Sequence, residues 1–148
     1  ENLPIPQKVV PILALRDDTD TTDPVTLYTA PGNAPGNVKS LSAKLSEASA
    51  KIVQLSIDNG EDIFPLARVQ VPASAGHSGT VAVADLLSPT IFPTSLQVDA
   101  GGKRYLAIAP GCSLRAALVA SLGASETLSI IGHAEEFEAE AEPEEPEE

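Results

Sequence analysis

The chain has 148 residues and a mass of 15.3 kDa, the size of one domain that can bury a core without disulfides or metals. Apolar residues make up 43% of the chain and aromatic residues only 3%, with no Trp, which argues against a surface that stacks bases or sugars. The net charge is −12 and the sequence has no cluster of Lys and Arg, so we expect no direct binding to nucleic acid and none to anionic membranes.

The negative charge is concentrated at one end of the sequence. Nine of the 21 acidic residues lie in residues 134–148, which contain no basic residue. The other 12 acidic residues face nine basic ones, so residues 1–133 carry a net charge of only −3. Like charges and two prolines prevent the last segment from joining a packed core. We therefore expect a nearly neutral body followed by an acidic tail.

The cysteine count and the hydropathy of the sequence exclude several other classes of protein. Cys112 is the single cysteine, so the chain has no internal disulfide and no Cys-based zinc site. No apolar run approaches the roughly 20 residues that a membrane-spanning helix needs. Residues 1–10 lack a charged stretch followed by an apolar one, so we expect no signal peptide.

Thirteen prolines and ten glycines divide the chain into short runs rich in Val, Ile, Leu and Thr, a pattern typical of many short strands. The first run contains Pro11, which predicts either an edge strand or an extended arm, because proline cannot donate to a strand ladder. In chain order, the expected strands are residues 8–16, 24–30, 38–45, 52–57, 63–71, 80–87, 96–98, 103–109, 113–120 and 126–133.

Two segments also fit a helix. Residues 41–53 align three apolar side chains at helical spacing, but they contain three serines and run into a clean alternation over 52–57, so two strands are favoured. Residues 113–122 are rich in Ala and Leu and could be a short helix, although a strand is again favoured. Asn59-Gly60 predicts a type I′ hairpin turn.

The fold class expected from these elements is all-β, an antiparallel β-sandwich or jelly roll of eight to ten short strands. Three regions follow from the composition. Residues 1–23 form an N-terminal arm and an acidic loop, residues 24–133 form the β-sandwich domain, and residues 134–148 form the acidic tail.

Residues that could carry chemistry are few and scattered. His77 lies in a loop of small residues, and His133 lies at the end of the last expected strand. Neither has a metal-ligand partner at local spacing, and a Cys112–His133 nucleophile–base pair could arise only through folding. We therefore expect ordinary structural roles for all three residues, no catalytic residues and no cofactor.

The acidic loop allows one further interpretation. Four carboxylates lie within seven residues of one another, and a calcium ion takes six to eight oxygen ligands. The loop lacks the central Gly and the closing Glu of an EF-hand, so a solvated turn is favoured and we expect no metal site. The four carboxylates are those of Asp17, Asp18, Asp20 and Asp23.

The order of several short motifs resembles that of a group of small β-sandwich proteins from the virions of tailed bacteriophages. The resemblance covers about residues 24–137. The chain differs from the group in residues 1–23, 72–80 and 88–103 and in the acidic tail. The motifs are LYTAPG at residues 27–32, VKSLSA at 38–43, the alternating segment at 51–57, VPA at 71–73, TVAVADL at 80–86, APGCSLRA at 109–116 and LSIIGH at 128–133.

The resemblance implies a non-enzymatic virion structural protein, above all a capsid decoration (cement) protein that binds and stabilises the head shell. Its partners would be the major capsid protein or other virion proteins, it would form a homotrimer, and it would be assembled into the virion in the cytoplasm of a host bacterium. Two alternatives stay open. One is a low-copy neck, tail, baseplate or fibre component, and the other is a β-sandwich module that binds host-surface carbohydrate.

The residues expected to contact a partner lie in the N-terminal arm. Leu3, Ile5, Val9 and Val10 are apolar, and three prolines within residues 4–11 hold this segment extended, which lowers the entropy lost on docking. The alternative is that this segment adds an edge strand to its own sandwich. The acidic tail could dock on a basic surface or stay solvated.

Overall fold

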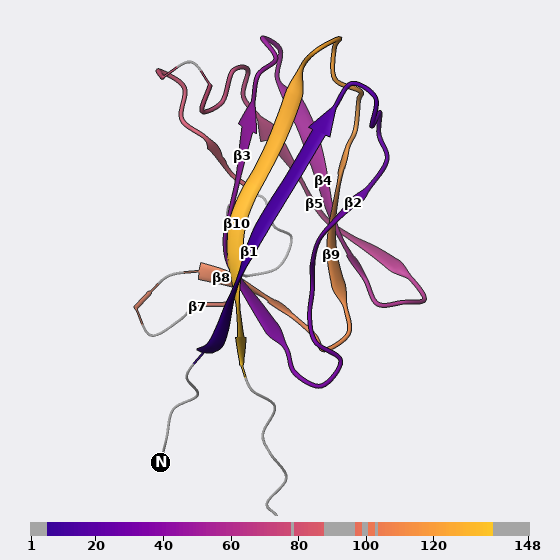
Figure 1. Ribbon diagram of the computed structural model, residues 1–148, viewed down its shortest axis with the longest axis vertical. Helices are drawn as coiled ribbons and strands as arrows, with labels where there is room; N and C mark the ends of the chain where they lie inside the picture. The colour runs from indigo at the N-terminus through magenta and orange to yellow at the C-terminus, as the bar shows by residue number, and fades with distance from the viewer. Residues whose placement is uncertain (1–5, 78, 88–96, 99–100, 103, 138–148) are drawn as a thin grey trace, which may run out of the picture.

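The computed structural model describes residues 6–77, 79–87, 97–98, 101–102 and 104–137. These residues form ten strands and no helix, arranged as two antiparallel sheets that pack against each other (Figure 1). The structure thus confirms the all-β antiparallel sandwich predicted from the short runs of Val, Ile, Leu and Thr between prolines and glycines.

The first sheet has the strand order β1-β10-β3-β8-β7, with β6 also pairing with β3, and the second has the order β2-β9-β4-β5. Within each sheet, all of these strand pairs are antiparallel. The strands are β1 (Pro6–Asp17), β2 (Val25–Thr29), β3 (Gly36–Leu45), β4 (Lys51–Asp58), β5 (Ile63–Val71), β6 (Ala84–Asp85), β7 (Gln97–Val98), β8 (Arg104–Ile108), β9 (Ser113–Leu118) and β10 (Thr127–Phe137).

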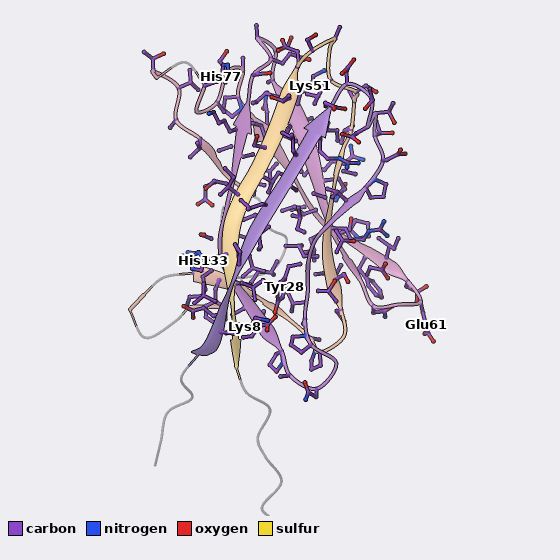
Figure 2. All side chains as sticks on the ribbon, viewed as in Figure 1. Lys8, Tyr28, Lys51, Glu61, His77 and His133 are labelled. Carbon is purple, nitrogen blue, oxygen red and sulfur yellow. The ribbon has the colours of Figure 1, made fainter. Side chains whose placement is uncertain are left out.

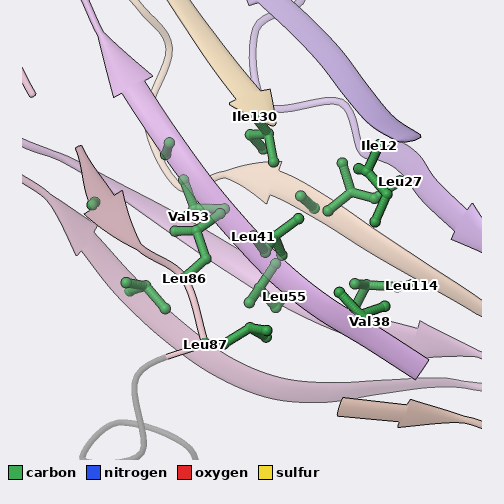
Figure 3. Packing of buried hydrophobic residues seen from close by; sticks show 14 of the residues in the cluster. Ile12, Leu27, Val38, Leu41, Val53, Leu55, Leu86, Leu87, Leu114 and Ile130 are labelled. Carbon is green, nitrogen blue, oxygen red and sulfur yellow. The ribbon is translucent and has the colours of Figure 1, made fainter. Parts of the chain in front are cut away.

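The core lies between the two sheets and is built by alternating residues of facing strands (Figure 3). In β9, every second side chain is buried and those between them are half-exposed, as the period of two in a strand requires. The largest fully buried side chains are Ile12, Leu41, Leu45, Leu55, Leu86, Ile108, Leu114, Leu128, Ile130, Val38, Val53 and Val71.

Both segments that also fitted a helix are strands. Residues 41–53 form the end of β3, a short turn and the start of β4. Residues 113–118 form β9, in which Leu114 and Leu118 point into the core. Tertiary packing decides in favour of strands here, because two sheets can bury alternating side chains that a single helix face could not.

The hairpin at Asn59-Gly60 exists, but the predicted type I′ turn is wrong. Residues 59–62 form a four-residue loop between β4 and β5, and only Gly60 has a positive φ, of 96°. The Asn59 side-chain oxygen accepts hydrogen bonds from the backbone N–H groups of Glu61 and Asp62, at 2.9 and 2.7 Å. Asn59 therefore closes the loop with its side chain instead of adopting the left-handed conformation itself.

The strand expected over residues 80–87 is shorter than predicted, since only Ala84–Asp85 pairs as β6. The segment before it folds into turns that take hydrogen bonds a strand would have used. Leu45 donates its backbone N–H to the Ala75 carbonyl at 2.9 Å, and Gly76 donates to the Val81 carbonyl at 2.7 Å. The loop therefore covers the end of β3, where a longer strand would otherwise lie.

At the start of the chain, the structure shows an edge strand. β1 pairs with β10 from Pro6 to Asp17 and ends the first sheet among the described residues. β10 continues to Phe137, four residues past its expected end, because Ala134 is fully buried there. The first residues of the expected acidic tail therefore belong to a strand, and residues 138–148 lie outside the described part of the chain.

Gly132 of β10 supports a testable prediction about the packing of β10 against its neighbour β3. A Cβ at Gly132 would overlap the Ser40 carbonyl oxygen of β3, and backbone cannot move aside as a flexible side chain can. We expect Gly132→Ala to lower the free energy of unfolding by about 1–3 kcal/mol, measured by urea denaturation. Gly32→Ala is the control, because a Cβ at Gly32 meets nothing within 4 Å. Equal effects of the two variants would contradict the tight strand packing.

Candidate functional site

Large apolar side chains gather on the outer face of β1 and β10. Val9, Leu13 and Leu15 of β1 are 61, 74 and 63% exposed, and Ile131 of β10 is 51% exposed. Leu13 and Ile131 are direct partners in the antiparallel register, so their side chains lie on the same face of the sheet. We call these four residues the β1–β10 strip.

The strip follows from an unusual sequence in β1, which is apolar on both of its faces. Ile12 is buried, and Val10 and Ala14 are half-buried against the core. Leu13 and Leu15, between and beyond them, point the other way. A continuous apolar run is typical of a strand covered on both faces. Here the outer face of β1 remains open to solvent.

A shallow groove runs along the strip. Its volume is about 250 Å³. The groove is lined by Leu13, Ala14, Leu15, Ser129, Ile130 and Ile131. Since most of these side chains are apolar, the groove suits an apolar occupant better than a charged one.

The free edge of β1 lies beside the strip. β1 is the end strand of its sheet among the described residues, so alternate backbone N–H and C=O groups point away from β10 with no described strand opposite them. Pro11 removes one donor from β1. The segment from Ile12 to Asp17 contains no further proline, and so one half of β1 keeps all of its backbone groups.

Charged residues border the strip at its two ends. Lys8 is exposed near the start of β1, and Asp18 is exposed just after the end of β1. Arg16, the other base of β1, is held by the acidic loop. Its guanidinium lies 3.5 Å from an Asp20 carboxylate oxygen and donates a 2.8 Å hydrogen bond to the Asp23 carbonyl. Glu136 of β10 lies directly opposite Lys8, and Glu135 lies opposite Val9, so the Lys8 end of the strip carries negative charge as well.

The acidic loop uses its carboxylates within itself. Asp17 accepts hydrogen bonds from the hydroxyl and the backbone N–H of Thr19, at 2.6 and 2.9 Å, which lower the pKa of its carboxyl. Asp20 accepts the backbone N–H of Asp17 at 2.8 Å. Within the described ranges, no group of three or more His, Cys, Asp or Glu side chains is arranged to hold a metal ion. The loop is thus organised as a turn.

The two histidines and the cysteine are not brought together. His77 lies near one end of the molecule, whereas His133 lies about midway along it (Figure 2). His133, on the first sheet, has its Nδ1 2.8 Å from the Ser40 hydroxyl. Cys112 directly precedes β9 of the second sheet and is half-buried against the core. This arrangement gives no nucleophile–base pair between Cys112 and His133.

The residues expected to contact a partner have different environments. Val9 is exposed and belongs to the strip, whereas Val10 packs on the core. Leu3 and Ile5 lie outside the described residues. Sequence reasoning did not single out Leu13, Leu15 or Ile131. For Leu13 and Leu15, the signal was the unbroken apolar run of β1, which an edge strand with one solvated face does not need.

A larger hollow, of about 520 Å³, lies between β3, β6 and β8. Its lining carries both signs of charge, from Lys39, Arg104 and Asp85. The segment that joins Leu87 to Arg104 is described at residues 97–98 and 101–102 alone, so the described lining is incomplete on that side.

Among all of the residues that the structure describes, no helix is long and apolar enough to cross a membrane.

Comparison with known proteins gives little. No family model and no curated protein matches the chain. Among solved structures, the chain is similar to one in "Structure of infectious bursal disease virus Gx strain", with 14% identity and a TM-score of 0.30. The match covers 95% of this chain and 37% of that one, so the chain spans little more than a third of its length. A TM-score this low carries no argument about the chain's fold or function.

The lower end of β10 is fixed to the second sheet by a buried tyrosine. Tyr28 of β2 donates a 2.7 Å hydrogen bond from its hydroxyl to Glu136 of β10 (Figure 2). Burial, and next the Glu136 carboxylate, raise the pKa of the Tyr28 hydroxyl well above its usual value. Gly36 leaves room for the ring, because a Cβ there would overlap it.

The raised pKa of Tyr28 predicts a loss of stability in alkali. The folded state holds the Tyr28 proton more tightly than the unfolded state does, so the contribution to stability is complete below about pH 10, the usual tyrosine pKa, and is lost as the pH rises further. We expect Tyr28→Phe to remove part of this loss, measured as urea midpoints between neutral and strongly alkaline pH. Tyr105→Phe is the control and should keep the full alkaline loss. The same alkaline profile in Tyr28→Phe and the native chain would contradict the role of Tyr28.

Proposed function

We propose that this chain is a non-enzymatic structural protein of a bacteriophage virion, acting as a capsid decoration protein that binds and stabilises the head shell. Its working parts are then surfaces that contact other proteins. The observation that carries the proposal is the β1–β10 strip.

The strip supports a protein-binding role because exposing large apolar side chains to water is unfavourable, at roughly 25 cal/mol for each Å². Single exposed apolar residues are ordinary, but neighbouring ones on one face mark contact sites. Leu13 and Ile131 are direct neighbours across two strands, and Leu15 lies two residues along β1. These side chains therefore offer a partner one continuous apolar area.

The virion setting rests on the sequence resemblance. The motifs that carry it fall on the described scaffold, with LYTAPG in β2 and the turn after it, VKSLSA in β3, and LSIIGH in β10. An antiparallel sandwich of this size is the architecture that the resemblance implies. The major capsid protein is the proposed partner, and the virion is the proposed location.

Copy number in the particle tests this proposal. Purified virions of the phage that encodes the chain would be analysed by quantitative mass spectrometry, with the major capsid protein as the internal standard. We expect a copy number of the same order as that of the major capsid protein, because a decoration protein repeats over the shell.

Two other results would each count against the proposal. A copy number that is a small fraction of that of the capsid protein would place the chain at the neck, tail or baseplate instead. Absence from the particle would refute a virion role. The next experiment would then test the carbohydrate-binding alternative, by titrating the chain with host-surface polysaccharide and measuring the fluorescence of its tyrosines.

A further inference from the structure

We propose that Asn59 is a site of self-catalysed deamidation, in which the backbone nitrogen of Gly60 attacks the side-chain carbonyl carbon of Asn59 and ammonia is released. The loop of residues 59–62, between β4 and β5, is arranged to speed this reaction. The inference concerns the chemistry of the folded chain itself, so it does not depend on the particle in which the chain works.

The side-chain carbonyl of Asn59 is held and polarised by two backbone donors. Its oxygen accepts the N–H groups of Glu61 at 2.9 Å and of Asp62 at 2.7 Å. Attack on a carbonyl carbon moves negative charge onto the oxygen, and a pair of backbone N–H donors stabilises such an oxyanion. The hydrogen bond from Glu61 also closes a small ring that contains both the Asn59 carbonyl carbon and the Gly60 nitrogen. The two reacting atoms are therefore kept close together.

The attacking nitrogen has a base beside it. The Gly60 N–H donates a hydrogen bond to one carboxylate oxygen of Asp58 at 2.8 Å, within the range for proton transfer to a general base. The other Asp58 oxygen lies 3.3 Å from the Arg115 guanidinium, which fixes the orientation of the carboxylate. Gly60 has no side chain to obstruct the attack, and its φ of 96° favours glycine at this position. Asn59 and Gly60 are both exposed, so water can complete the reaction.

The reaction balances as the net hydrolysis of a side-chain amide. The bond between the Gly60 nitrogen and Asn59 Cγ forms while Asp58 takes the proton of the Gly60 N–H. The bond between Cγ and Nδ2 then breaks, and the same proton leaves with Nδ2 as ammonia. Water opens the resulting succinimide at either of its carbonyls, which gives aspartate or isoaspartate at position 59. The sequence of steps consumes water, releases ammonia and involves no oxidation or reduction.

The product changes the charge of the loop. Residues 58–62 already carry the carboxylates of Asp58, Glu61 and Asp62, and Glu61 lies at the outer tip of the hairpin (Figure 2). A new carboxylate at position 59 adds a further negative charge at neutral pH. Aspartate keeps an oxygen that can accept the two N–H groups, whereas isoaspartate adds a methylene to the backbone between β4 and β5. The modified chain is therefore separable from the native chain by ion exchange.

Comparison of the folded and the unfolded chain tests the contribution of the loop. The full chain would be incubated at neutral pH, either folded or unfolded in guanidinium chloride, and followed by ion exchange, ammonia release and peptide mapping. We expect position 59 to react about tenfold faster in the folded chain, because only the folded loop holds the base and both donors in place. Asn33, exposed but followed by Ala34, is the internal control and should stay largely intact. An equal or lower rate at position 59 of the folded chain would overturn the proposal.

Two pairs of variants test the base and the donors separately. Asp58→Ser keeps a hydrogen-bond acceptor for the Gly60 N–H but removes the base. Asp62→Ser is its control, because it removes a carboxylate of the same loop and keeps the backbone N–H that Asn59 accepts. Glu61→Pro removes one N–H donor, and Glu61→Ala is its control because it keeps that donor.

We expect Asp58→Ser and Glu61→Pro each to lower the folded-state rate about threefold, a smaller effect than in buried sites because the loop is exposed to water. Both control variants should keep the native rate. Urea denaturation would establish that each variant folds, and the rate of each variant in guanidinium chloride would correct for the change of sequence alone. If Asp58→Ser and Glu61→Pro both react as fast as their controls, the proposed role of the loop is wrong.

Discussion

The position of β10 between β1 and β3 determines most of what this molecule presents to its surroundings. Side chains alternate along a strand, so the register of β10 decides which residues of both neighbours enter the core. With Leu13 opposite Ile131, the sheet buries Ile12 and Ile130. A slip of one residue would exchange the buried and exposed sets. The tight contact between Gly132 and the backbone of Ser40 opposes such a slip.

The sequence predicted the scaffold well where alternation was clean. β3, β4, β5 and β9 lie within two residues of their expected positions, because each carries alternating apolar residues between turn residues, and this alternation outweighed the helical spacing in two of the segments. The failures have local causes. Asn59 closes its loop through its side chain, which a two-letter turn motif does not reveal. Ala84–Asp85 is short because preceding turns occupy the end of β3, and that contact depends on tertiary structure.

The candidate site was harder to predict than the scaffold. The apolar run of β1 indicates two apolar faces, but no local pattern says which of them a neighbouring strand or sheet will cover. Only the pairing with β10 shows that Ile12 is buried while Leu13 is exposed. Ile131 was invisible for the same reason, since its role depends on lying opposite Leu13. Surfaces made by neighbouring strands therefore need the three-dimensional register.

The hydrogen bond from Tyr28 to Glu136 also has a bearing on how the molecule could be engineered. Glu136 lies next to Phe137, which pairs with Pro6 at the start of β1. The two ends of the described scaffold thus leave it side by side, from one pole (Figure 1). Peptides fused to either end would be displayed from that pole, and the opposite pole, with the acidic loop and His77, would stay clear for attachment to a support.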